Sequence, residues 1–256
     1  MAELPDLEVF SQILTRRYGG SVLEKLEVIE SRKLNVPAKA LKACLEGHKL
    51  SRVIRSGKTI QLVFGPDRVL GIHLMLRGEL VALSSASPRF AILIFHFHSG
   101  EGFAVVDMQK QATPTLDPPS ADVPDALELS YSAFKKLLSG KKMVIKTLLM
   151  DQKKLRGIGN SYGDEILYHA GISPFSIAGK IPEDSVKQLH KSIHSVLESA
   201  IKKIAGENGD ELRGELRDFM EVHGAKIKNT RKGEEVISDK IGGRTSYYTR
   251  SQVLFS

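Results

Sequence analysis

The stretch from Lys146 to Pro174, KTLLMDQKKLRGIGNSYGDEILYHAGISP, constrains the fold more than any other part of the chain. Its apolar residues recur at helical spacing on both sides of a glycine-rich step, which predicts a helix, a tight turn and a second helix. Gly157 and Gly159 supply backbone conformations that a Cβ atom would penalise, and Asn160 stands at the expected N-cap of the second helix. Because a helix start presents unpaired backbone N–H groups, this turn suits a phosphate.

Positive charge concentrates just before this turn. Residues 135–156 contain eight Lys or Arg and one Asp, so their net charge is 8 − 1 = +7, equal to the formal charge of the whole chain. An anion-binding turn in a basic field indicates a clamp on a nucleic-acid backbone. The alternative is an ordinary helical hairpin with a solvated lysine face.

Composition limits the class of protein and of partner. The sequence pI of about 9.3 favours a polyanion, with an anionic membrane as the competing partner. We find no apolar run of ~18 residues and no signal-peptide core, so we expect a soluble protein that is not secreted: cytoplasmic or nucleoid-bound in a bacterium, nuclear in a eukaryote. Cys44 is the one cysteine, which excludes an internal disulfide and a multi-cysteine zinc site.

The first half of the chain predicts a helix followed by a β-sandwich or barrel. Residues 5–17 and 37–45 have helical apolar spacing. Between residues 22 and 107, seven short segments rich in β-branched residues are separated by Gly, Pro, Asp or Ser, as in sandwiches and barrels. Residues 112–128 contain four prolines and few large apolar groups, which is typical of a linker.

The second half predicts helices and then a basic β-hairpin. The helical segments extend to about residue 206, and residues 225–256 become β-like, with a turn at Gly242–Gly243. His190 and His194 have metal-ligand spacing, but no carboxylate motif accompanies them, so a packed or solvated pair is the favoured interpretation.

The N-terminus offers an amine and a carboxylate for catalysis. Ala2 is small, so removal of Met1 is expected, which would leave the α-amine of Ala2 as the first group. An α-amine is partly neutral near pH 7 and forms Schiff bases with carbonyl-like carbons, and Glu3 next to it could transfer protons. Lys58, after Gly57 and before a predicted strand, is either a phosphate ligand or a plain edge-strand lysine.

In this order, these segments resemble the formamidopyrimidine-DNA glycosylase / endonuclease VIII family. The matching segments are Ala2–Glu8, Arg55–Lys58, Leu148–Pro174 and Ile241–Thr245, which together extend over essentially the whole chain. The resemblance implies an α+β fold: an N-terminal helix with a two-layer β-sandwich, a helix-two-turn-helix domain, and a C-terminal β-hairpin finger without zinc. We expect domains at residues 1–112, 129–224 and 225–256, with a linker at 113–128.

The resemblance also implies a function and a set of site residues. Family members hold kinked DNA between the two domains with the damaged nucleotide flipped out, and their N-terminal amine attacks the sugar. We therefore expect a bifunctional glycosylase and AP lyase for oxidised bases, with β/δ-elimination, acting as a monomer on damaged DNA without a cofactor or metal. By position, the catalytic residues are Ala2, Glu3 and Lys58, and the DNA-binding residues are Leu76, Lys110, Lys146, Gly159, Asn160 and Arg244.

Four departures from the family pattern qualify this expectation. Ala2 replaces the usual proline, and its primary amine still forms an imine. The finger lacks the four zinc-binding cysteines, so packing must hold it. Leu76 takes the place of the methionine that fills the vacated helix position, and Met75 replaces a glycine.

The loop 107–112 departs most. Lys110 aligns with the arginine that contacts the orphaned base, and Gln111 aligns with an aromatic residue. Neither replacement reproduces the original contact, so we expect weak discrimination of the opposite base and an additional ability to use single-stranded or bubble DNA. The alternative function is a non-catalytic protein of the same fold that binds lesions or abasic sites.

Overall fold

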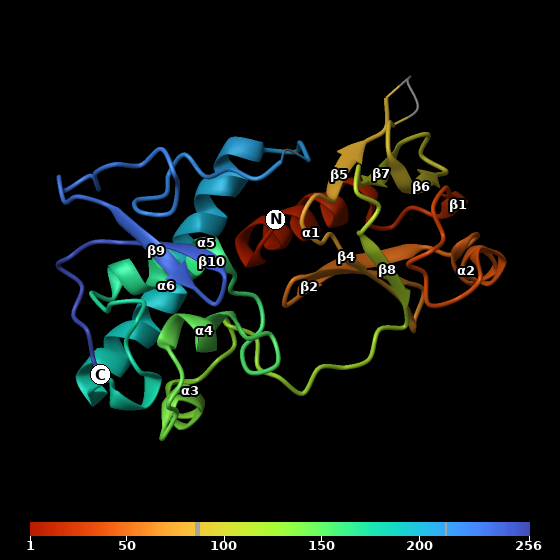
Figure 1. Cartoon of the computed structure of the whole chain (residues 1–256). Coiled ribbons are helices and arrows are strands. Elements are labelled where there is room, and N and C mark those ends of the chain that lie inside the picture. Colours follow the sequence, from red (N-terminus) through yellow and green to blue (C-terminus); the bar gives the residue numbers. More distant parts are fainter. Residues whose placement is uncertain (85–87, 213) are drawn as a thin grey trace. The chain divides into compact units, whose positions relative to one another are not determined.

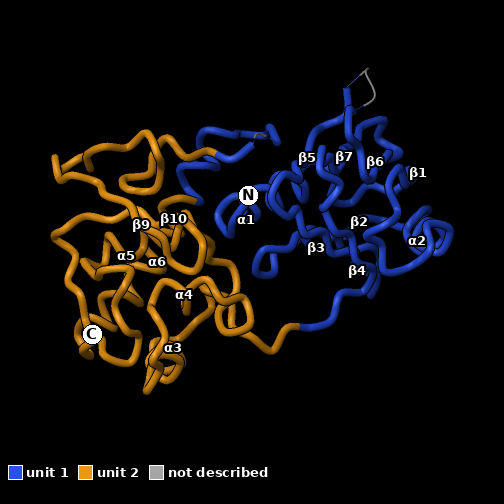
Figure 2. Tube along the Cα trace, viewed as in Figure 1, with its two compact units in different colours: residues 1–120, 201–215 blue, residues 121–200, 216–256 orange. Residues whose placement is uncertain are grey.

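The computed structural model describes residues 1–84, 88–212 and 214–256 of the chain. The chain divides into two compact units (Figure 2). Unit 1 comprises residues 1–120 and 201–215, and unit 2 comprises residues 121–200 and 216–256.

Unit 1 begins with helix α1, Leu4–Tyr18, where the sequence predicted a helix over residues 5–17. Glu3 is its N-cap and forms a capping box with Asp6, whose Oδ2 accepts the Glu3 N–H at 2.9 Å. Pro5 stands in the first turn, where the missing N–H costs nothing. The apolar face of α1 enters the core of unit 1 through Leu7, Phe10 and Leu14 among others.

Within the described residues, eight strands of unit 1 form two antiparallel four-stranded sheets (Figure 1). One sheet has the order β1-β6-β7-β5 and the other the order β2-β3-β4-β8. The predicted two-sheet fold is therefore confirmed. The bounds are β1 Leu23–Val28, β2 Leu50–Ser56, β3 Thr59–Phe64, β4 Arg68–His73, β5 Glu79–Ala82, β6 Ala91–Phe97, β7 Gly102–Val106 and β8 Thr113–Leu116, and the short helix α2, Ala38–Leu45, lies between β1 and β2.

One apolar cluster joins the two sheets to α1 and α2. Its members come from α1, α2 and strands of each sheet, and several of its aromatic rings contact one another. Phe95 and Phe103 stack at 4.5 Å between ring centroids, and Tyr18 of α1 stacks on Phe97 at 5.1 Å. Burial of the apolar faces of the sheets and helices favours packed layers over isolated helices and strands.

Strand β8 lies inside the proline-rich segment that the sequence predicted to be a linker. It contains Pro114, and among the residues that the structure describes it pairs with β4 alone, at the edge of its sheet. An edge strand tolerates proline because the missing donor would face away from the ladder.

Two turns connect one sheet to the other. The β4–β5 turn comprises residues 74–78, and the β7–β8 turn comprises residues 107–112. Both carry residues that the sequence analysis assigned to DNA binding.

Unit 2 contains the predicted helices and the hairpin (Figure 1). Its elements are α3 Tyr131–Leu138, α4 Ile145–Met150, α5 Asn160–His169, the 3-10 turn Ala178–Lys180, most of α6 Glu183–Asn208, and the strands β9 Ile237–Ile241 and β10 Arg244–Tyr248. The hairpin turns at Gly242 and Gly243, whose φ angles of 57° and 77° favour glycine. Among the described residues, no helix is long and apolar enough to span a membrane.

Candidate active site and nucleic-acid interface

The first residues of the chain line a pocket in unit 1. The pocket has a volume of about 230 Å³, and the β4–β5 turn, the start of β5 and residues 214–215 form its other walls. The terminal ammonium group of Met1 forms an ion pair with the carboxylate of Glu215, and Ala2 is buried beside it. Arg77 and Glu79 add charges of both signs to the lining. Amine chemistry at this end of the chain would therefore occur in a confined, polar space.

Glu3 brings a buried carboxylate to the same end of the chain. The residue is 1 % exposed, and its place at the N-cap of α1 fixes its backbone. Ala2 and Glu3, both predicted to be catalytic, thus lie together at the anchored start of α1.

Lys58 lies in the tight turn between β2 and β3. It is 9 % exposed, and the preceding Gly57 has a φ of 59° that favours glycine. Arg55 braces this turn: its Nε lies 2.9 Å from Oε2 of Glu8 in α1, and its Nη1 donates to the carbonyl of Gly57 at 3.2 Å. The turn that carries Lys58 is therefore tied to the helix that begins at the N-terminal residues.

His73 lies near Lys58, and no motif in the sequence marked it as a site residue. It faces Thr59 across the β3–β4 ladder. Burial lowers the pKa of His73, and the charge of Lys58 lowers it further. Its Nδ1 accepts the Met75 N–H at 3.0 Å, so the neutral ring carries its proton on Nε2. Only the strand register reveals this neighbourhood, because the two residues are 15 positions apart in the sequence.

Leu76 and Lys110 lie on the two turns that connect the sheets. Leu76 is exposed, one position after Met75, whose φ is 57°. Lys110, with a φ of 54°, directs its Nζ to Oε2 of Glu30 at 3.3 Å. Hydrogen bonds from Arg32, and to a smaller extent from Lys110, lower the pKa of Glu30 to about 2, so this partner is ionised at neutral pH.

The glycine turn of unit 2 has the predicted conformational demand at Gly157 but not at Gly159, whose φ of −122° is extended backbone that any residue adopts. Gly157 has a φ of 104°, and the side chain of Gln152 spans the turn, donating to two backbone carbonyls and accepting the Gly157 N–H at 3.0 Å. The N-cap of α5 is Gly159 instead of the predicted Asn160, which is the first helical residue. The side chain of Asn160 is thereby released from capping and reaches the hairpin.

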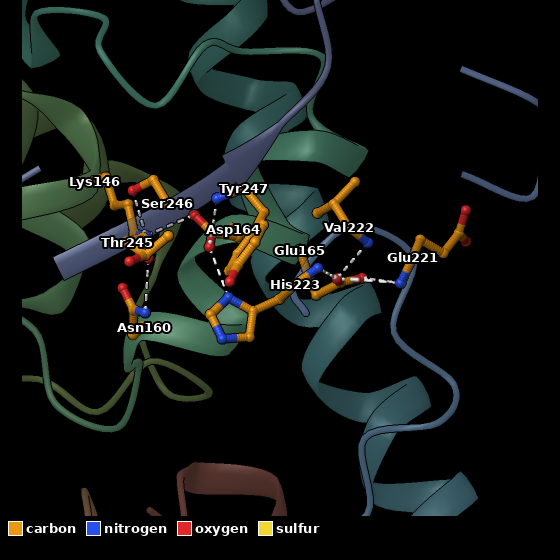
Figure 3. A network of polar contacts seen from close by, with 10 residues as sticks. All are labelled: Lys146, Asn160, Asp164, Glu165, Glu221, Val222, His223, Thr245, Ser246 and Tyr247. Carbon is orange, nitrogen blue, oxygen red and sulfur yellow. Dashed lines mark hydrogen bonds and ion pairs between the residues drawn. The ribbon is translucent and has the colours of Figure 1, made fainter. Parts of the chain in front are cut away.

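Asn160 contacts the strand that carries Arg244. Its Nδ2 donates to the carbonyl of Thr245 at 3.0 Å, and its Oδ1 is buried without a hydrogen-bond partner among the described residues (Figure 3). An amide nitrogen has two hydrogens, so one remains for a ligand. Arg244 is exposed at the hairpin turn, where it lines a second pocket of about 270 Å³ together with residues of α4.

Lys146 differs from the expectation that it contacts DNA. The residue is 1 % exposed, and its Nζ lies 2.6 Å from Oδ1 of Asp164 and 2.6 Å from Oγ of Ser246 (Figure 3). A lysine in the interior with two anionic or polar partners is not available to a phosphate. Its contacts connect α4, α5 and β10, so its role in the fold is to hold these elements together.

Asp164 is the centre of this buried network. Its Oδ2 accepts the Tyr247 N–H at 3.0 Å and lies 2.7 Å from Nδ1 of His223 (Figure 3). The next residue, Glu165, accepts the three successive backbone N–H groups of residues 221–223 at 2.8–3.1 Å. Two adjacent carboxylates of α5 therefore fasten the hairpin and the segment that leads to it.

Comparison with known proteins agrees with this architecture. Residues 1–113 match the model of the formamidopyrimidine-DNA glycosylase N-terminal domain, and residues 121–209 match that of the formamidopyrimidine-DNA glycosylase H2TH domain. The formamidopyrimidine-DNA glycosylase of Brevibacillus brevis is 30% identical over 268 residues, which cover 96% of this chain and 97% of that protein. The chain belongs to the formamidopyrimidine-DNA glycosylase family.

Solved structures of the family superpose over nearly the full length. Lactococcus lactis Fpg in complex with abasic-site DNA is 26% identical, with a TM-score of 0.85 and coverage of 97% of this chain and 98% of that one. The same protein with DNA containing an oxidised pyrimidine gives a TM-score of 0.86 at 26% identity. Family membership makes the chain an enzyme, a DNA glycosylase.

The finger contains no cysteine, because Cys44 is the one cysteine of the chain. No cluster of three or more His, Cys, Asp or Glu side chains suited to a metal occurs among the described residues. His190 and His194 pack ring against ring at 4.8 Å, and Nε2 of His190 lies 2.7 Å from the carbonyl of Leu129. In this family member the hairpin is held by the Asp164 network and by ring contacts of Tyr247 and Tyr248.

Proposed function

We propose that the chain excises oxidised bases from damaged DNA and then cuts the strand at the abasic site through a Schiff base on the amine of Ala2. Of all the observations, the placement of the N-terminal residues carries this proposal. Ala2 is buried at a pocket, and the carboxylate of Glu3 is anchored beside it. DNA is the partner because the relatives of known structure are complexes with abasic or lesion-containing DNA.

The chemistry follows from an amine, a carboxylate and a pocket. The neutral amine of Ala2 attacks C1′ of the deoxyribose, and the base departs with the bonding electron pair and takes up a proton. Opening of the sugar ring leaves an imine, which acidifies C2′, and loss of a C2′ proton expels the 3′ phosphate. Glu3 exchanges protons with the sugar during these steps. Lys58, Asn160 and Arg244 hold phosphates, which position the strand without selecting the base.

Borohydride trapping tests the proposal. The mature protein is incubated with an oligonucleotide carrying one abasic site, and reduction of the Schiff base is expected to give a covalent adduct that maps to Ala2. In a control protein, one residue is added before Met1, so that Met1 is retained and the amine of Ala2 stays blocked. This protein is expected to bind the same DNA but to give no adduct. If the mature protein gives no adduct, the chain is a lesion-binding protein without this chemistry.

Asn160→Ala is expected to weaken binding to damaged and undamaged duplexes alike, by roughly 10- to 100-fold, since one hydrogen bond to a charged group is lost. Fluorescence anisotropy with two duplexes that differ only in the lesion measures this effect. Asn229→Ala, an exposed asparagine of the same unit, serves as the matched control and should bind as the wild type. A loss confined to the damaged duplex would contradict a phosphate-binding role.

A further inference from the structure

The N-terminal pocket lies at one end of the β1-β6-β7-β5 sheet, and all four strands reach this end. Glu79 of β5, which lines the pocket, pairs with Val106 of β7, and Val106 also pairs with Ala91 of β6. The carbonyl of Ile92 accepts the N–H of Ile29, the residue after β1, at 3.0 Å. Because neighbouring strands lie about 4.8 Å apart, this row of strand ends, here called the sheet rim, extends for about 14 Å from Glu79 to Ile29.

Phe90, directly before β6, presents an aromatic ring at the sheet rim. It is 41 % exposed, whereas the other phenylalanines among the described residues are buried or half-buried. Its φ of 60° is rare for a bulky residue. The Asp107 N–H donates to the Phe90 carbonyl at 2.9 Å, which holds this backbone in place. Uncommon backbone conformations cluster at ligand-binding positions, so the exposed ring points to a contact with a ligand.

A cation and an aliphatic side chain stand next to this ring. Cζ of Arg89 lies 4.6 Å from the centroid of the Phe90 ring. Ile29, on the adjacent strand end, is 59 % exposed. A planar ring beside a guanidinium group suits the face of a nucleobase, which stacks on aromatic rings and on arginine. Ile29 extends the exposed apolar surface on the side of Phe90 that is farther from the pocket.

The charges around this surface favour an anionic chain. The rim segments 29–33, 89–90 and 107–110 contain four Lys or Arg and two acidic residues, so their net charge is 4 − 2 = +2. Both carboxylates are already engaged: Glu30 contacts two of these cations at 3.1 and 3.3 Å, and Asp107 accepts three backbone N–H groups at 2.7–2.8 Å. An exposed ring among cations matches a strand that offers both free base faces and phosphates.

We propose that Phe90 and Ile29 form a platform on which an unpaired nucleobase of single-stranded or bubble DNA stacks. Neighbouring bases cover one another's faces in a duplex, so the platform binds DNA that is locally unpaired, and no side chain enters a base stack. Two strand spacings, about 10 Å, separate Phe90 from the pocket wall at Glu79, so one strand can occupy the pocket and the platform together. The inference rests on the proposed function for its ligand, DNA, but does not depend on the chemistry at Ala2.

Phe90→Asn tests the platform, because asparagine tolerates a positive φ and removes the ring. Fluorescence anisotropy measures binding of an undamaged labelled single strand and of the same strand paired in a duplex. The variant is expected to bind the single strand about 10-fold more weakly than the wild type, since one stacked base is lost, and to bind the duplex equally well. Phe90→Trp should restore single-strand binding. Because the chain has no tryptophan, the indole fluorescence of this variant reports on the platform alone, and the single strand should quench it.

Leu254→Asn, which removes a 56 % exposed apolar side chain of unit 2, is the matched control and should bind both DNAs as the wild type. If Phe90→Asn binds the single strand as tightly as this control, or if the single strand leaves the fluorescence of Phe90→Trp unchanged, the platform is refuted. Equal weakening on single strand and duplex also refutes it, as does a wild type that does not bind the single strand. A wild type that binds the single strand but gives no borohydride adduct on abasic DNA refutes the catalytic proposal alone, because binding of undamaged DNA needs no reaction.

Discussion

Replacing Glu3 with Gln is expected to leave a folded, DNA-binding protein whose base excision is slower by about 10²- to 10⁴-fold, the usual contribution of one general acid or base. The carboxylate stands next to the proposed nucleophile, Ala2, in the sequence, and Glu3 is buried at the start of α1. Glutamine has the same shape, and its amide oxygen still accepts a backbone N–H, so the helix start is retained. The substitution therefore removes the group that exchanges protons but keeps the hydrogen bond that anchors the start of α1.

Single-turnover excision from a duplex with one oxidised base measures this loss, and thermal unfolding checks the fold. Glu24→Gln makes the same change of charge at an exposed position of β1 and should excise at the wild-type rate. Excision by Glu3→Gln at that rate would exclude Glu3 as the acid–base partner. A large fall in unfolding temperature would show that its carboxylate serves the helix instead.

The strands of unit 1 could be predicted because their amino-acid composition suits the burial that they have in the structure. Each of the seven predicted segments contains one observed strand, since β-branched and aromatic residues suit a pleated surface that is buried on one or both faces. Strand β8 was missed because it is four residues long and contains Pro114, a local signal for a linker. Its pairing with β4 is a long-range contact, which composition along the chain does not encode.

Residues of the candidate site could be proposed from the sequence only where they lie in a continuous motif. Ala2, Glu3 and the glycine turn at Gly157–Gly159 belong to short segments whose chemistry is local. His73 was not predicted as a site residue, because its proximity to Lys58 comes from strand register: it faces Thr59, the neighbour of Lys58, across the β3–β4 ladder.

The burial of Lys146 is not visible in the charge pattern of the sequence. It belongs to a run of basic residues, and such a run predicts a solvated or DNA-facing surface. Its partners, Asp164 and Ser246, are 18 and 100 positions away in the sequence, so the burial of this one lysine could not be inferred from its neighbours. The basic stretch therefore contains one cation that acts inside the protein.

The buried Lys146 helps to hold the hairpin in place. A family finger built on zinc is held by a metal, whereas here three consecutive residues of β10 contact α4 and α5: Thr245 through Asn160, Ser246 through Lys146, and Tyr247 through Asp164. Arg244, the expected phosphate ligand, immediately precedes them. The buried ion pair therefore holds the strand on which the exposed arginine depends.

Asp164→Asn is accordingly expected to destabilise unit 2 by about 3–5 kcal/mol, because it leaves the ammonium group of Lys146 buried without its counter-charge. Denaturant unfolding measures this loss, and DNA affinity should fall with it as the hairpin loosens. The double variant Lys146→Met with Asp164→Asn removes the stranded charge, while the asparagine still accepts the Tyr247 N–H. It should recover most of the stability, because neutral replacement of a buried pair is often nearly neutral in free energy.

The double variant distinguishes an ionic anchor from a simple packing contact. If Lys146 and Asp164 acted independently, their effects would add, and the double variant would be the least stable of the three. A double variant more stable than Asp164→Asn alone shows that the two charges act as one unit. Lys187→Met with Asp184→Asn removes an exposed pair of unit 2, whose Nζ and Oδ1 lie 3.2 Å apart, and should change stability by less than about 1 kcal/mol. Equal losses for the buried and the exposed pair would refute the anchor.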